Sequence, residues 1–213
     1  MRFLSFPLIF LSIALSLALV PEVAVMVAHS WKTYIPLLAG VLLYIILGFI
    51  PFMSKNSDHI RTLSHEFSHW IVSIFFFHKI HAFNVQGGSG YISHSGRFGD
   101  IFIGLAPYCV PVFTIFILLL RSLIIPEALM YFDVAAGLTL AFHIACFAGD
   151  IGTHQTDITG RGVFKSYAFI FAAWMFFAML IALSLKHDIF WGVKYIFVGY
   201  WDSICDFFRM IFA

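Results

Sequence analysis

Residues 60–77 have the sequence IRTLSHEFSHWIVSIFFF, which is long and apolar enough to form one continuous helix. His65 and His69 stand four residues apart in it, and residues with this spacing lie one turn apart on the same face of a helix. Glu66 directly follows the first histidine. The stretch therefore predicts a helix that carries two imidazoles and a carboxylate among apolar neighbours.

The composition of the chain indicates a lipid environment. Of its 213 residues, 62% are hydrophobic, and the mean hydropathy is +0.96. Charged residues make up 11%, whereas about 25% is usual in soluble domains. A soluble globule cannot hide this much apolar surface, so we expect an integral, multi-pass membrane protein surrounded by the lipid bilayer. The formal net charge of +1 gives no sign of a nucleic-acid partner.

The apolar runs predict an all-α polytopic fold with about six transmembrane helices. We expect the first run to be a retained membrane helix rather than a cleaved signal peptide, because it is long and Pro21-Glu22 makes a poor cleavage site. The last stretch, 189–213, mixes aromatic and charged residues, which is typical of an interfacial helix or of a final span whose ends are exposed to water. With no linker or repeat, residues 1–213 are predicted to form a single integral membrane domain. The apolar runs lie at 3–28, 33–53, 98–121, 126–148 and 164–185, with the shorter motif run at 60–77 and the mixed stretch at 189–213.

A glycine-rich segment follows the motif helix. Residues 85–94 have the sequence VQGGSGYISH, and this pattern predicts a short β-hairpin or a re-entrant insertion. Irregular backbone at membrane depth must be surrounded by protein or water. A hairpin at this position could line a cleft and hold an extended substrate by strand addition. The simpler alternative is an ordinary external loop.

The H-E-x-x-H spacing is suited to zinc. His65 and His69 can both reach one Zn²⁺ at about 2.0–2.1 Å. Glu66 beside them is expected to act as the catalytic base toward a zinc-activated water. The opposing interpretation is a group of polar residues satisfied by neighbouring helices. Lipid disfavours that interpretation, because ionisable groups inside a membrane are costly and tend to be functional.

Zinc requires a third protein ligand, with one position left open for water. Glu127 is a poor candidate, because it lies in an expected loop. The better source is the polar cluster at 149–158, which contains Asp150, His154 and Asp157. The residues alone leave the choice among these three open, since each aspartate could instead cap a helix in a solvated loop.

Three blocks of the sequence resemble the site-2 protease family of intramembrane zinc metallopeptidases, in particular its compact bacterial branch. The block at 63–70, LSHEFSHW, is similar to the family's H-E-x-G-H helix, with serine in place of the common glycine. The block at 88–94, GSGYISH, is similar to the family's G-S-G-x-T segment. The block at 104–108, GLAPY, is similar to the A-G-P or A-G-Y segment that opens the next helix. The family's L-D-G or N-P-D-G signature around the third ligand is missing.

The resemblance implies a metallopeptidase core at 60–165 that hydrolyses peptide bonds of membrane-embedded or membrane-proximal substrates. The expected partners are thus a membrane protein or peptide substrate and the bilayer, and the expected cofactor is Zn²⁺. The alternative is a zinc-binding membrane protein without protease activity, such as a scaffold or a degenerate relative. The resemblance assigns Glu66 as the catalytic residue and His65, His69 and Asp157 as metal ligands, with Asp150 in reserve.

A simple count of spans conflicts with this site. If the motif helix and the next two apolar runs each cross the membrane once, Asp157 ends on the opposite face from His65. The two side chains could not then share a metal. The sequence therefore predicts either that 60–95 is re-entrant or that one of the later segments does not cross.

Overall fold

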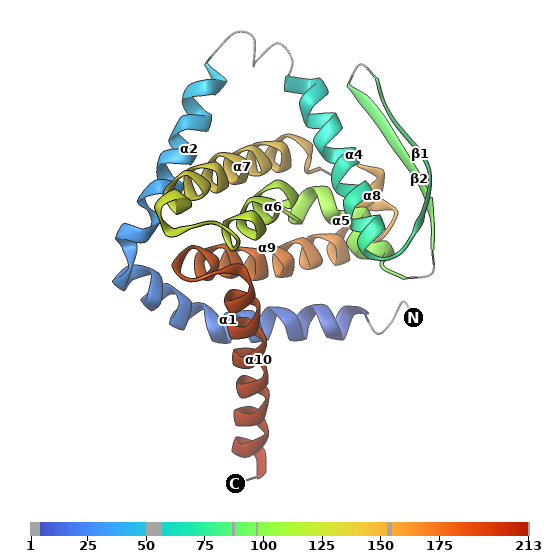
Figure 1. Ribbon diagram of the computed structural model, residues 1–213. Coiled ribbons are helices and arrows are strands. Elements are labelled where there is room, and N and C mark those ends of the chain that lie inside the picture. The colour runs from blue at the N-terminus through green and yellow to red at the C-terminus, as the bar shows by residue number, and fades with distance from the viewer. Residues whose placement is uncertain (1–4, 50–56, 87, 97, 153–154, 213) are drawn as a thin grey trace.

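The computed structural model describes residues 5–49, 57–86, 88–96, 98–152 and 155–212. They form helices and one two-stranded sheet (Figure 1), so the expected all-α class is confirmed, with the hairpin added to it. In chain order the elements are α1 (Ser5–His29), the 3₁₀ turn η1 (Trp31–Tyr34), α2 (Ile35–Gly48), α4 (Ser57–Phe75), β1 (Lys79–Gln86), β2 (Ser89–Ser95), α5 (Asp100–Cys109), α6 (Val112–Arg121), the 3₁₀ turn η2 (Pro126–Ala128), α7 (Leu129–Asp150), α8 (Thr156–Thr159), α9 (Val163–Lys186) and α10 (Ile189–Phe212).

Long apolar helices indicate a membrane protein. Within the described residues, four helical segments are long and apolar enough to cross a bilayer, and a fifth is added if the bent pair α5–α6 counts as one span. The expected number of about six is not reached, because α4 and α10 carry too many charged side chains among their apolar residues. The four segments are Phe6–His29, Trp31–Gly48, Pro126–Asp150 and Val163–Lys186.

The apolar run at 98–121 forms two helices instead of one. α5 and α6 meet at an angle of 83°. Pro111 at the break has no N–H with which to continue the helix, and it disfavours the helical conformation at the residue before it. That residue, Val110, is extended, with φ −101° and ψ 105°. The run at 98–121 is therefore not one straight helix, and it counts as one span only as a bent pair.

The bend brings later segments back toward the motif helix. α7 follows α6 after a short turn and packs against both α6 and α2. It ends beside α5, and the next helix, α8, contacts α5 as well. Since α5 also packs against α4, the end of α7 and the short helix α8 come close to the motif helix (Figure 1).

Two glycines allow α2 and α7 to cross closely. A Cβ added to Gly40 would collide with the carbonyl oxygen of Val134, and a Cβ added to Gly137 would collide with the carbonyl oxygen of Leu37. Each glycine therefore faces the backbone of the other helix. Small residues of this kind let helices approach in membranes, where close packing rather than the hydrophobic effect drives helix association.

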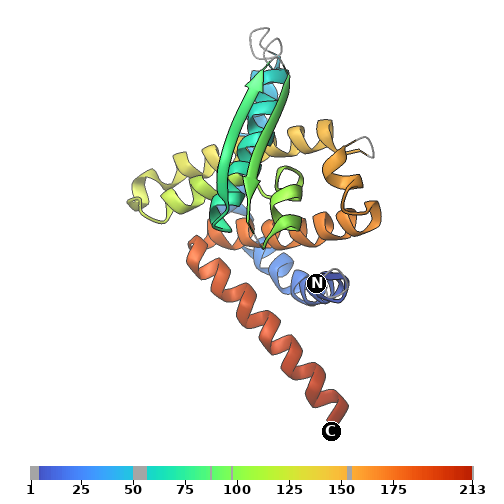
Figure 2. The ribbon, with the colours of Figure 1, turned by 90° about the vertical axis from the view of Figure 1, so that its right-hand side faces the viewer.

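The glycine-rich segment forms the predicted β-hairpin. β1 and β2 pair in antiparallel fashion, with a bulge between Ile80 and Ala82. Gly88 lies at the turn with φ +87°, a conformation that favours glycine. The hairpin runs alongside α4 (Figure 2) and contacts it through both strands. One side of the motif helix is thus covered by the sheet.

A buried arginine joins three helices at the far end of α7. Arg121 forms an ion pair through Nε with Asp133 near the start of α7. Its Nη1 donates to the carbonyls of Ser184 (3.0 Å) and His187 (2.9 Å), and its Nη2 donates to that of Leu185 (2.8 Å). The guanidinium therefore satisfies the last carbonyls of α9, which have no partner within the helix. A buried charge of this kind is tolerated because it is fully paired.

Replacing Gly137 with alanine should force α2 and α7 apart, because the new Cβ collides with the Leu37 backbone. We expect a loss of about 1–3 kcal/mol in the free energy of unfolding. The measurement is the thermal unfolding of the detergent-solubilised protein. Gly48→Ala is the matched control, since Gly48 lies in the same pair of helices with open space around it. Equal unfolding temperatures for the two variants would contradict the close crossing.

Candidate metal centre

The motif residues lie on α4, as their spacing predicts. The ring centroids of His65 and His69 are 5.0 Å apart. Their side chains are 14% and 8% exposed, which places both imidazoles inside the protein. His65 also meets the ring of Tyr108 on α5 edge-on, at 5.4 Å between centroids. The histidine face of α4 is therefore directed at α5.

Asp157 reaches the histidines from α8. Its neighbour Ile158 is fully buried and packs in a cluster with Leu105 and Tyr108 of α5. Arg161, one turn later, donates from Nη1 to the carbonyl oxygen of Asp157 at 3.1 Å and lies 3.8 Å from its Oδ1. The apolar anchor and the arginine together fix the short helix, and with it the direction of the Asp157 side chain.

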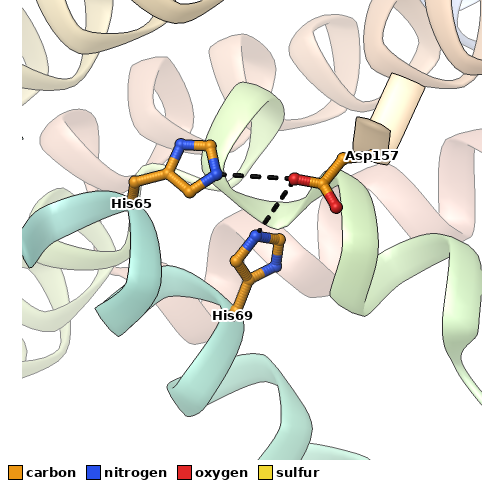
Figure 3. Close-up of side chains that lie close together, drawn as sticks. All are labelled: His65, His69 and Asp157. Atoms are coloured by element: carbon orange, nitrogen blue, oxygen red, sulfur yellow. Dashed lines mark ion pairs between the residues drawn. The ribbon is translucent and has the colours of Figure 1, made fainter. Parts of the chain in front are cut away.

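The side chains of His65, His69 and Asp157 converge on one point (Figure 3). Oδ2 of Asp157 lies 3.5 Å from Nε2 of His65 and 3.4 Å from Nε2 of His69, and all three potential ligand atoms lie within 4.8 Å of one another. Ligands bound at about 2.0–2.2 Å around a tetrahedral ion lie about 3.3–3.5 Å apart. The three side chains therefore form a group that could hold a metal ion.

A proline in α5 supplies the partner that orients His69. Pro107 has no N–H, so the carbonyl of Ile103 four residues earlier lacks its usual partner within the helix. Nδ1 of His69 donates to that carbonyl at 2.7 Å. This bond fixes the ring and its tautomer, and it leaves Nε2 free to face Asp157.

The structure places Asp150 behind His65 rather than in the group. Oδ2 of Asp150 accepts from Nδ1 of His65 at 3.4 Å, on the opposite edge of the ring from Asp157. The reserve ligand of the sequence analysis is thus not brought to the point where Nε2 of both histidines meets Asp157. The remaining candidate, His154, lies outside the described residues.

Glu66 is buried next to the group, beneath the hairpin. It is 8% exposed, and a Cβ added to Gly90 of β2 would collide with its side chain. Only glycine at this position lets the strand approach so closely. Burial raises the pKa of the Glu66 carboxyl, while the charges of His69 and His65 oppose the rise. A carboxylate whose pKa is raised toward neutrality is a better proton acceptor and donor at neutral pH.

Charges within the group are strongly coupled. Burial would lower the pKa of His65, but Asp150 and Asp157 outweigh it and raise that pKa to about 9. Burial would raise the pKa of Asp157, but hydrogen bonds from His65 and His69 hold it below its usual range. The ionised carboxylate therefore favours cations at this point, and a metal ion must compete with a proton for His65.

Several residues that shape the group were not predicted from the sequence. Arg61 precedes His65 by four residues on α4, and Arg161 follows Asp157 by four residues, just beyond the end of α8. The helical spacing that selected the two histidines could have found both arginines. Pro107 and Tyr108 lie within a block quoted for the family resemblance, but their contacts to the group depend on how α5 packs.

Comparisons with known proteins identify no relative of this chain. No protein-family model matches it, and no curated protein or solved structure matches it. The resemblance to the site-2 protease family thus stands on the motif residues alone. What the chain does has to be inferred from the chemistry of the group itself.

Replacing His65, His69 or Asp157 with alanine should each abolish stoichiometric metal binding, because two remaining ligands hold an ion weakly. The measurement is the metal content of the purified protein by atomic emission. His81→Ala is the matched control, since His81 is an exposed histidine on β1 whose Nε2 contacts only Ser95 Oγ at 2.8 Å. Unchanged metal content in all three ligand variants would rule out this group as the binding site.

Proposed function

We propose that this protein is a multi-pass membrane zinc metallopeptidase that cleaves membrane-embedded or membrane-proximal peptides. The observation that carries the proposal is the convergence of His65, His69 and Asp157 beside the buried Glu66. Two imidazoles and one carboxylate, with a general base adjacent, are the side chains that zinc peptidases use. The apolar helices support a membrane location for this chemistry.

The donor set fits zinc. Two nitrogen ligands and one oxygen ligand, with the oxygen 3.5 and 3.4 Å from the two nitrogens, would leave a fourth position for water or substrate, as in catalytic rather than structural zinc sites. Bound zinc would supply a Lewis acid and lower the pKa of water to about 7. His69 is oriented by the Ile103 carbonyl, so its Nε2 needs no rearrangement to serve as a ligand.

Glu66 is the proposed general base. It shares α4 with the two histidines and lies near enough for their charges to affect its pKa. It would accept a proton from the attacking water and pass it to the leaving amine of the cleaved peptide bond. Its burial under β2 keeps bulk water away from the carboxylate.

The hairpin is the proposed substrate platform. β1 and β2 pair only with each other in the described part of the chain, so their outer edges retain backbone groups available to another strand. A peptide added to such an edge is held in extended form through main-chain hydrogen bonds. An extended substrate on this hairpin would run alongside α4, because the hairpin itself does (Figure 2).

A metal-binding membrane protein without protease activity is the second candidate. The observation that favours it is the low exposure of Glu66, only 8%, since a working base must meet the substrate. In this alternative the metal ties α4 to α8 and stabilises the fold. The two candidates agree on metal binding and differ on cleavage.

Replacing Glu66 with glutamine should lower peptide cleavage by about 10²–10⁴-fold, the usual contribution of a general base, while metal content stays the same. The assay follows single-span apolar peptides reconstituted with the protein in liposomes, with products identified by mass spectrometry. Glu127→Gln is the matched control, since Glu127 is exposed and lies in η2, at the start of α7. If the Glu66→Gln variant cleaved the peptides at the rate of the parent protein, Glu66 would not be the general base. If neither the parent protein nor any variant cleaved them, the metal-binding alternative would be favoured.

Replacing Gly90 with alanine should also lower cleavage, because the added methyl group must displace either β2 or the Glu66 carboxylate. We expect metal content to be retained, since the three atoms nearest to the added methyl group all belong to Glu66. Ser93→Ala in the same strand is the control, because Ser93 is exposed. The comparison uses the same liposome assay. Equal rates for both strand variants would show that the close contact between β2 and Glu66 has no part in cleavage.

A further inference from the structure

Asp150 bridges two basic side chains at the end of α7. Its Oδ1 lies 3.0 Å from Nε of Arg61, and its Oδ2 lies 3.4 Å from Nδ1 of His65. The Asp150 side chain is 15% exposed, whereas that of Arg61 is 40% exposed. Each carboxylate oxygen thus has its own partner, and both partners come from α4.

Arg61 is held in place for this contact. A Cβ added to Gly149, the residue before Asp150, would lie 3.1 Å from Nη1 of Arg61, so the guanidinium lies directly against the backbone of α7. Arg61 also reaches the exposed Asp58, with Nη2 at 3.5 Å from its Oδ1. The arginine therefore lies between two carboxylates, of which only Asp150 also contacts a histidine of the group.

The two histidines are oriented by different means. His69 donates from Nδ1 to the Ile103 carbonyl, a fixed backbone group. His65 donates from Nδ1 to a carboxylate, and that carboxylate depends on Arg61 for its position. A carboxylate behind a ligating imidazole fixes its tautomer and raises its basicity, which strengthens metal binding.

We propose that Asp150 is a positioning residue, which Arg61 holds against Nδ1 of His65 so that Nε2 points at the metal. The inference rests on the proposed metal centre but not on protease activity. Asp150 is not itself a ligand in this arrangement, because it lies at the Nδ1 edge of the ring whereas Asp157 lies at the Nε2 edge. Arg61, Asp150 and His65 form a chain of contacts that ends at the metal.

The test is the metal affinity of the purified full-length protein in detergent, by competition with a chromophoric zinc chelator. Asp150→Asn should keep one equivalent of zinc but bind it about 10–100-fold more weakly. The visible absorption of the Co²⁺-substituted variant should also shift, since the His65 ring is no longer fixed. Asp58→Asn is the matched control, because it removes the other carboxylate from Arg61 without touching a ligand, and it should bind zinc like the parent protein.

Each outcome separates the possible roles of Asp150. Affinity and Co²⁺ absorption equal to those of the parent protein would overturn the positioning role. Complete loss of zinc, as expected for Asp157→Asn, would also overturn it and make Asp150 a ligand. A parent protein that binds no metal would instead overturn the metal centre as a whole.

Should Asp150→Asn fail to fold, Arg61→Gln serves as the second variant, because Arg61 is 40% exposed. It should weaken zinc binding in the same direction, and unchanged affinity would overturn the proposal.

Discussion

The candidate site exists only because an aspartate from α8 reaches two histidines on α4, and this meeting depends on the break between α5 and α6. A straight helix through residues 100–121 would carry the chain away from the motif. The 83° angle at Pro111 instead lets α7 return alongside α6 and end next to α5. α5 then lies between the motif helix and α8, and it contacts both. His65 and Asp157 lie together although the span count placed them on opposite faces, and the run that this count treated as one straight segment is bent.

Two prolines in one short segment serve different purposes. Pro111 ends α5 and so sets the path of everything that follows. Pro107, one turn earlier, stays within the helix and frees the Ile103 carbonyl, which then accepts from His69. The usual cost of proline in a helix is a lost hydrogen bond. Here the Ile103 carbonyl that loses its helical partner accepts a hydrogen bond from His69 of the metal group instead.

Much of the fold follows from the sequence, because its signals are local. The apolar composition, the motif helix and the hairpin depend on spacing and on glycine positions that can be read directly. The bend does not show in hydropathy, because one proline at the bend leaves most of residues 98–121 apolar. The residues alone could not decide between Asp150 and Asp157, since both lie in one polar cluster, and only the family resemblance favoured Asp157. Only the point at which α7 ends decides which carboxylate faces Nδ1 of His65 and which faces Nε2.

α7 is held by an ion pair at each end. Asp133 meets Arg121 where α6 and α9 end, and Asp150 meets Arg61 on the motif helix. The helix between the two aspartates has a length of about 25 Å at 1.5 Å per residue. Inserting or deleting one residue there would turn one aspartate by about 100° relative to the other, so that only one ion pair could form at a time. The two ion pairs therefore constrain the number of residues between Asp133 and Asp150.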